Sequence, residues 1–265
     1  LRGKLRWLPS GRDSLDLTLM YIDIDNGYDA FSLDNTRHTL SDVPGTDQQK
    51  SYAAGLQWHR ELDKLVLDLA STGASTDSRY AYDEDWSYVG IAPDWEYSSY
   101  DQYDRKRDSY SATARLSSGD GGRLFANSSD WVVGIYYLGE REHLQRRYTY
   151  LENDFTSDYD TDTYALFGQL DTRLNERIKL VTGLRVERRY TDYRDNNDVQ
   201  SDPDKDLWGG RIALEYHLAD TGMVYASVSR GYRANGINAG ILASMETTDD
   251  PDIIAELESQ REFDE

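Results

Sequence analysis

The feature that most constrains the fold is a two-residue alternation of apolar and polar side chains, repeated along most of the chain. In the segment 178–190, Leu180 and Leu184 belong to an apolar series, whereas Arg185 and Glu187 belong to the charged series between them. Successive side chains of a β-strand point to opposite faces, so each such segment predicts a strand with one apolar and one polar face. At helical spacing these charges would surround the whole circumference, and the sequence therefore predicts an all-β chain.

The connections between the predicted strands alternate in length. The predicted strands cover residues 2–8, 14–24, 50–59, 63–72, 108–117, 130–140, 162–173, 178–190, 206–217 and 222–233. Most of the connections that follow the odd-numbered strands are short, such as 174–177, and most of the others are long, such as 73–107 and 141–161. Short periplasmic turns and long extracellular loops are typical of outer-membrane barrels. The predicted fold is therefore an antiparallel transmembrane β-barrel segment of about ten strands with long extracellular loops.

The composition fits a barrel better than a compact soluble core. Only 38% of the residues are hydrophobic and the net charge is −20, yet 12% are aromatic. Disordered chains are poor in aromatic residues, whereas a barrel needs one apolar face, a polar lumen and aromatic girdles. The acidic balance argues against a nucleic-acid partner. No apolar run approaches the length of about 20 residues that a membrane helix needs.

Aromatic residues fall near the ends of the predicted strands, where a barrel meets the membrane interfaces. We expect an interfacial belt there, although the same residues are also ordinary β-formers in half-buried strands. The candidates are Trp7, Trp58, Trp131, Tyr148, Tyr190, Trp208 and Tyr232.

The connection 73–107 is the candidate ligand-binding segment. It intersperses aromatic rings with acids such as Asp85 and Asp94, and flat rings beside hydrogen-bonding groups suit an amphipathic ligand such as an iron chelate or a sugar. The alternative is a loop that packs on its own aromatic side chains. The candidate contacts are Trp86, Tyr88, Trp95, Tyr97, Tyr100 and Tyr103.

Charged residues on the polar faces of two adjacent strands are predicted to line the lumen. They are Arg185, Glu187, Arg189, Arg211 and Glu215, and we expect ion pairs across strands rather than direct substrate contacts. Asp158, Asp160 and Asp162 have the start of a calcium-loop pattern, but Thr163 stands where that loop requires glycine. We therefore expect no specific metal site, no cofactor and no catalytic constellation.

Three segments resemble the barrel of TonB-dependent outer-membrane receptors. They are WVVGIYYL at 131–138, YALFGQLDTRLNERIKLVTGLRVERR at 164–189 and VYASVSRGYRANGIN at 224–238. The resemblance implies a receptor in the bacterial outer membrane, surrounded by its lipid, that imports a bulky scarce nutrient such as a ferric siderophore. It also implies a plug domain, a TonB-type energy transducer and an extracellular nutrient ligand as partners, and no enzymatic activity.

The strand number departs from that family. Its barrels have about 22 strands and a plugged lumen. We therefore expect residues 1–265 to form a partial barrel without a plug domain, seen as an open curved sheet. Two other interpretations are a small outer-membrane barrel enzyme of the protease or lipase type, and a soluble acidic, aromatic-rich β-protein that binds sugars.

Overall fold

The chain forms one long antiparallel sheet. The computed structural model describes all residues except 28–30, 220–221, 235, 239–249, 261 and 264–265. The strands are β1 (Arg2–Ser10), β2 (Asp13–Asp25), β3 (Thr46–Glu61), β4 (Leu65–Asp83), β5 (Tyr100–Ser118), β6 (Ser129–Tyr148), β7 (Phe155–Arg173), β8 (Ile178–Asp195), β9 (Gln200–Ser201), β10 (Lys205–Ala219) and β11 (Gly222–Arg230). Neighbours in sequence are neighbours in the sheet, except that the short β9 pairs with β8 alone.

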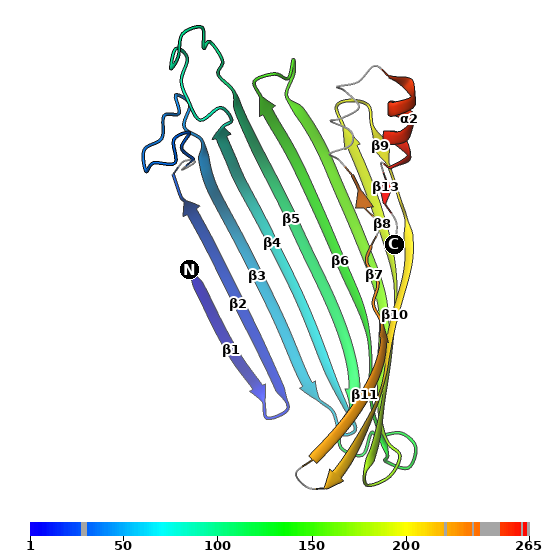
Figure 1. Ribbon diagram of the computed structural model, residues 1–265. Coiled ribbons are helices and arrows are strands. Elements are labelled where there is room, and N and C mark those ends of the chain that lie inside the picture. Colours follow the sequence, from blue (N-terminus) through cyan, green and yellow to red (C-terminus); the bar gives the residue numbers. More distant parts are fainter. Residues whose placement is uncertain (28–30, 220–221, 235, 239–249, 261, 264–265) are drawn as a thin grey trace.

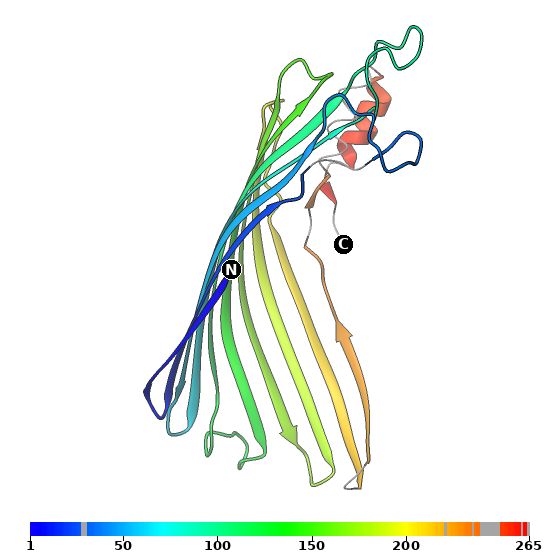
Figure 2. The ribbon, with the colours of Figure 1, turned by 90° about the vertical axis from the view of Figure 1, so that its left-hand side faces the viewer.

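The sheet is open, as predicted. Its order runs from β1 to β11, and within the described residues β1 and β11 do not pair with each other. The sheet curves from the β1 edge to the β11 edge, so β10 and β11 turn away from the plane of β1–β6 (Figures 1 and 2). The predicted all-β antiparallel barrel segment is therefore confirmed as an incomplete barrel.

A small second unit follows β11. It comprises β12 (Gly236–Ile237), α2 (Pro251–Ser259) and β13 (Glu262–Phe263), with β12 and β13 paired. Asp250 caps the helix by accepting a hydrogen bond from the backbone N–H of Asp252 at 3.0 Å. None of the helices in the described part of the chain has the length and apolar character needed to cross a membrane.

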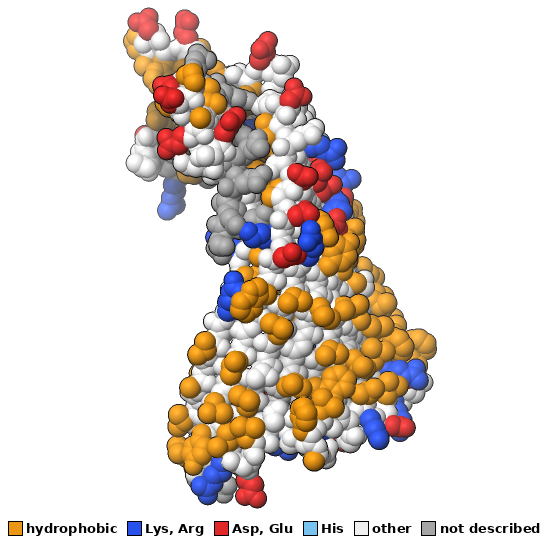
Figure 3. All heavy atoms as spheres, turned by 90° about the vertical axis from the view of Figure 1, so that its right-hand side faces the viewer, with side chains coloured by type: hydrophobic (Ala, Val, Ile, Leu, Met, Phe, Trp, Pro, Cys, Tyr) orange, Lys and Arg blue, Asp and Glu red, His pale blue; other side chains and the backbone are white. Residues whose placement is uncertain are grey.

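The alternation in the sequence places apolar side chains on the convex face. Ile135, Leu166 and Ile212 on this face are 60%, 57% and 60% exposed, whereas Ala165 and Ala213 on the concave face are 7% and 1% exposed. Hydrophobic side chains gather over the lower half of the convex face beside β10 and β11, with most of the charged side chains above them (Figure 3). An exposed apolar band of this kind on a curved sheet is typical of the lipid-facing surface of a barrel.

Several strands extend much further than the sequence pattern predicts. The predicted loops 73–107, 141–161 and 191–205 shrink to 84–99, 149–154 and 196–204, because β4 to β8 continue past the apolar band. Outside the apolar band both faces are polar, so the alternation ends although the hydrogen-bonded pairing continues. The predicted contrast between long and short connections is therefore partly wrong: 149–154 is shorter than 119–128 at the other end of the sheet. The connection expected between the predicted strands 206–217 and 222–233 includes residues 220–221, which lie outside the described residues.

An aromatic belt closes the upper edge of the apolar band. Tyr110, Tyr137, Tyr164 and Tyr190 lie in contact on the convex face of β5 to β8, with centroid distances of 5.5, 4.9 and 6.1 Å between successive rings. At the other end of the sheet, Trp7, Trp58 and Trp131 lie on the same face near the connections 11–12, 62–64 and 119–128. The Arg230 guanidinium lies 3.8 Å from the Trp208 ring centroid. The expectation is wrong for Tyr148, whose ring contacts Arg146 on the concave face of β6, and for Tyr232, whose hydroxyl accepts a hydrogen bond from Arg185 on the concave face of β8.

Gly45 allows the connection before β3 to pack against β4. A Cβ atom at this position would lie 1.7 Å from the carbonyl oxygen of Ala81. We expect Gly45→Ala to destabilise this junction by about 1–3 kcal/mol, because the backbone must move apart. Limited proteolysis of the 26–45 connection would measure the effect. Gly11→Ala is the matched control, since a Cβ there meets no atom within 4 Å, and equal protease sensitivity of both variants would contradict the prediction.

Candidate functional site

The concave face of β8 and β10 carries all five residues predicted to line the lumen. Arg185 and Glu187 form an ion pair of 2.7 Å along β8, and the Tyr232 hydroxyl donates to Glu187 at 3.1 Å. Glu215 lies opposite Lys179 on the neighbouring strand, with 4.0 Å between their charged atoms. The expected pairing across strands therefore occurs at Glu215 but not between Arg185 and Glu187.

Two arginines of this group have no ion pair in the described part of the chain. Arg211 lies exposed on β10, and the buried Nε atom of Arg189 has no hydrogen-bond partner. These two cations are therefore available to a further group on the concave face. Arg189 and Arg211 lie on the same concave wall as Arg185. The structure does not bring them into contact with the aromatic loop, which is the 84–99 connection that carries Trp86, Trp95 and Tyr97.

The upper part of the concave face holds an arginine–tyrosine cluster, formed by Tyr82, Asp101, Tyr103, Arg105, Arg146 and Tyr148. At its centre, Arg146 forms two hydrogen bonds of 3.0 and 2.8 Å with the carboxylate of Asp101. Asp101 is only 1% exposed, and it also accepts hydrogen bonds from the hydroxyls of Tyr82 and Tyr103 at 3.2 and 2.9 Å. Burial and the nearby Asp101 raise the pKa of Tyr82 to about 12, so this hydroxyl keeps its proton.

Aromatic rings hold the guanidinium groups of the cluster. The Arg146 guanidinium lies 5.3 Å from the Tyr103 ring centroid and 4.9 Å from that of Tyr148, and Arg105 lies 5.1 Å from Tyr103. A cation over a ring face gains about 0.5–2 kcal/mol and is fixed in position. The three phenol hydroxyls of the cluster already donate to Asp101 or Glu84. The cluster therefore presents oriented guanidinium groups, which suit a ligand with several anionic oxygens.

The structure separates the six predicted ligand contacts into different environments. Trp95 packs edge-on against Tyr97, and Tyr97 stacks on Tyr150 of the next connection at 5.8 Å. Trp86 instead stacks on Phe31 at 5.1 Å. Tyr88 is 43% exposed in the 84–99 connection. Tyr100 and Tyr103 lie on β5 rather than in a loop, and only Tyr103 belongs to the arginine–tyrosine cluster.

Glu84 connects the aromatic loop to the arginine–tyrosine cluster. Its carboxylate accepts a hydrogen bond from Tyr148 at 2.9 Å and another from the Ser99 hydroxyl. Tyr148 in turn packs edge-on against Tyr150 at 5.5 Å. A continuous aromatic surface therefore runs from Trp95 through Tyr97 and Tyr150 to Tyr148.

The sequence interpretation missed Arg105, Arg146, Tyr148 and Tyr150 as site residues. Arg146, Tyr148 and Tyr150 lie on segments far from residues 84–99 in the sequence, and Tyr148 was assigned to the membrane interface. Arg105 lies inside the predicted connection 73–107, but only the aromatic residues of that connection were singled out. The sequence does carry one signal for the arginine: Arg146 lies among the polar residues of 139–147, where apolar alternation has ended. Only strand pairing shows that Arg146 lies beside Tyr103.

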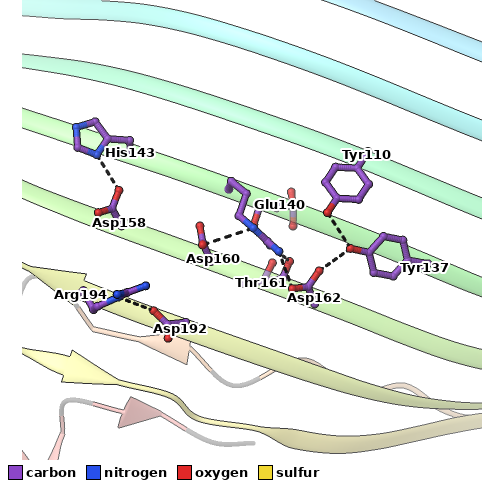
Figure 4. A network of polar contacts seen from close by, with 11 residues as sticks. Tyr110, Tyr137, Glu140, His143, Asp158, Asp160, Thr161, Asp162, Asp192 and Arg194 are labelled. Atoms are coloured by element: carbon purple, nitrogen blue, oxygen red, sulfur yellow. Dashed lines mark hydrogen bonds and ion pairs between the residues drawn. The ribbon is translucent and has the colours of Figure 1, made fainter.

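A second polar network lies on the convex face above the aromatic belt (Figure 4). Arg141 contacts Asp160 at 3.5 Å and Asp162 at 2.7 Å, and His143 pairs with Asp158 at 2.8 Å. Each of the three aspartates of the partial calcium-loop pattern, Asp158, Asp160 and Asp162, therefore has a cationic or imidazole partner. No group of three or more His, Asp or Glu side chains suited to a metal ion occurs in the part of the chain that the structure describes.

The sheet resembles solved structures of outer-membrane receptors. The ferric yersiniabactin uptake receptor FyuA from Yersinia pestis matches with a TM-score of 0.65 and 19% identity, over 89% of this chain and 38% of that one. The ferric citrate transporter FecA matches with a TM-score of 0.64 and 14% identity, over 92% of this chain and 37% of that one. The alcaligin receptor FauA from Bordetella pertussis matches with a TM-score of 0.63 and 15% identity, over 86% of this chain and 34% of that one.

The chain thus spans less than two fifths of the length of each of these structures. At these identities the likeness shows a shared fold. A search of curated protein sequences gives no significant match. A family model described as TonB dependent receptor-like, beta-barrel, matches residues 5–256, which is nearly the whole chain. This chain therefore belongs to the TonB-dependent receptor family and forms part of its β-barrel.

Proposed function

We propose that this chain is part of an outer-membrane receptor that imports a bulky, scarce nutrient, and that the nutrient is a ferric siderophore or a similar iron complex. The observation that carries the proposal is the arginine–tyrosine cluster on the concave wall, next to an aromatic loop at the same end of the sheet. A ligand arriving from outside would meet Trp95 and Tyr97 first and the fixed guanidinium groups of Arg105 and Arg146 next.

The chemistry of an iron chelate fits these two surfaces. Such a complex combines a flat or apolar ligand frame with several anionic oxygens around the metal. Aromatic faces accept the frame, and charge-assisted hydrogen bonds from guanidinium groups accept the oxygens. Several of the structurally similar receptors are named for ferric yersiniabactin, ferric citrate or ferric catecholates, which supports the same class of ligand here.

Transport would require parts beyond the sheet described here. In our proposal residues 1–265 are a partial barrel, the lipid of the outer membrane covers its convex apolar band, and a plug domain fills its lumen. Arg189 and Arg211 would face that plug from the lumen wall. Energy would come from a TonB-type transducer, and the protein would perform no covalent chemistry.

We expect Trp95→Ala together with Tyr97→Ala to weaken nutrient binding to the full-length receptor. Loss of the stacked surface with Tyr150 should lower affinity roughly tenfold or more, since each buried aromatic contact contributes about 1 kcal/mol. Binding of a panel of radiolabelled ferric siderophores to whole cells would measure it. Tyr52→Ala on the convex face is the control. Unchanged binding in the double variant would contradict the assignment of residues 84–99 as a ligand-binding loop.

A further inference from the structure

A row of three basic side chains lines the concave face of β1. Arg2, Lys4 and Arg6 alternate along this strand, so all three project to one face of the sheet. That face is the concave one, because Arg6 forms hydrogen bonds of 2.6 and 3.0 Å with Asp16, which lies between two apolar residues of the convex series. Among the described residues, no ion pair involves Arg2 or Lys4. This β1 basic row is an exception in a chain with a net charge of −20.

The β1 basic row forms one wall of a groove of about 600 Å³ on the concave face. The floor of the groove is built from small residues of β3 and β4, namely Ala53, Gly55, Thr72 and Ala74. Gly55 lies opposite Thr18, and Thr18 lies opposite Lys4, so the row and the floor share one level of the sheet. The charged lining residues are three cations and one acid, Asp16. The groove therefore combines open volume with an excess of positive charge.

The groove adjoins the wall that carries the arginine–tyrosine cluster. Arg105 of the cluster is followed on the same face of β5 by Arg107 and then Ser109, at intervals of about 7 Å. Ser109 lies opposite Ala74, and Ala74 lies opposite Ala53, so both alanines of the groove floor continue the same level. Cations therefore continue down the concave wall from the cluster toward the groove, and the side chains between Arg107 and the floor are small.

Basic side chains at this spacing suit a ligand with several anionic oxygens. Alternate residues of a strand lie about 7 Å apart, so a compact polyanion can contact two neighbouring members of the β1 basic row at once. Hydrogen bonds between charged groups are the stronger kind, and the floor offers the Thr72 hydroxyl without a competing carboxylate. Lys4 is an exposed, flexible point charge, whereas Arg146 is held between aromatic rings. We therefore expect the groove to bind anions more weakly than the cluster does.

We infer that the β1 basic row and its groove form a second, weaker anion-binding subsite on the concave wall, and that the nutrient is a polyanionic chelate that passes from the arginine–tyrosine cluster to this subsite. The transfer step rests on the proposed function, but the binding of an anion to the groove does not. A tight site above a looser one has a direction: the ligand is captured at the cluster and is released more easily from the groove.

Lysine acetylation of the full-length receptor in detergent, read by mass spectrometry, tests the subsite without any import. Citrate is the probe because it carries three carboxylates, and sucrose is the uncharged control. We expect citrate to slow the labelling of Lys4 about threefold once its concentration is about twice its dissociation constant. Lys50, which lies on the convex face opposite Asp23, is the internal reference and should be labelled at an unchanged rate. Arg2→Gln should reduce the protection of Lys4, whereas Arg194→Gln on the convex face should not.

Three results from this experiment would overturn the subsite. The first is equal labelling of Lys4 with and without citrate in the wild type, a comparison that needs no variant to fold. The second is protection by sucrose that equals protection by citrate. The third is a Lys4 that is inert before any anion is added, which would show that another part of the receptor fills the groove.

Uptake by whole cells tests the transfer step separately. Lys4→Gln should lower the energised uptake of an anionic ferric chelate more than it lowers binding of that chelate at the cell surface, and Lys50→Gln should lower neither. Equal uptake by Lys4→Gln and wild type would overturn the transfer. If citrate protects Lys4 but the wild type imports no iron chelate, the subsite stands and the proposed function fails.

Discussion

Truncating Arg146 to alanine is expected to destabilise the upper concave wall by about 3 kcal/mol and to abolish tight nutrient binding. The side chain of Asp101 is 2% exposed and would lose its two hydrogen bonds to the guanidinium. A buried carboxylate left without its partner costs much more than the pair contributes. Tyr103 and Tyr148 would lose the cation held between their rings, so nutrient affinity should fall by at least tenfold. Thermal unfolding and nutrient titration of the full-length receptor would measure both effects.

The neighbouring arginine provides a matched control for this experiment. Arg147 points to the convex face, is about half exposed and pairs with Asp154 at 3.4 Å. Arg147→Ala should change stability by less than about 1 kcal/mol, as is usual for exposed ion pairs. Arg146→Lys keeps the charge but loses the two-pronged contact, and should fall between wild type and alanine. Equal effects at Arg146 and Arg147 would mean that the arginine–tyrosine cluster is not a distinct site.

Placing a charge on the apolar band is expected to have the second large effect. Leu184 is 56% exposed on the convex face, midway along the apolar series of β8. Leu184→Arg should cost about 2–4 kcal/mol in a membrane, because an arginine near the bilayer midplane loses its hydration. The folded fraction in lipid vesicles, read from the heat-dependent shift in electrophoretic mobility, would measure the loss.

The same substitution decides between a lipid-facing and a water-facing sheet. In a soluble protein a side chain so exposed tolerates arginine, with changes within about 0.5 kcal/mol. Gln169→Arg is the control, because Gln169 lies on the concave face opposite Gly183. We expect Gln169→Arg to fold normally in vesicles. A full-length protein that folds without detergent and accepts Leu184→Arg would support the soluble sugar-binding alternative.

Which strands exist, and which residues share a face, could be read from the sequence. The segment 178–190 shows why: its alternation is local, and pleating converts it directly into an apolar and a polar face. The alternation failed to mark the strand ends, since β5 begins at Tyr100 rather than near residue 108. Beyond the apolar band neither face contacts lipid, so the pattern disappears although the hydrogen-bonded ladder continues.

The candidate site depended far more on tertiary structure. The sequence singled out Trp95, Tyr97 and Tyr103 because aromatic residues are dense there, yet it assigned them to one loop with Tyr100 and Trp86. The structure distributes these residues among a loop contact with Tyr150, a stack with Phe31 and the concave wall. Composition shows that aromatic residues are present but carries no information about their partners.

The sequence by itself therefore determined the β-class, the apolar convex face and the incomplete barrel. The first two follow from the local two-residue period, and the third follows from comparing the number of strands with the larger barrels of the family that the chain resembles. Only the tertiary structure decided that Arg146 meets Asp101 across 45 residues and that Tyr97 stacks on Tyr150. The physical reason is register: which residues of two strands face each other is set by pairing along their whole length, and a slip of one residue would reverse every face.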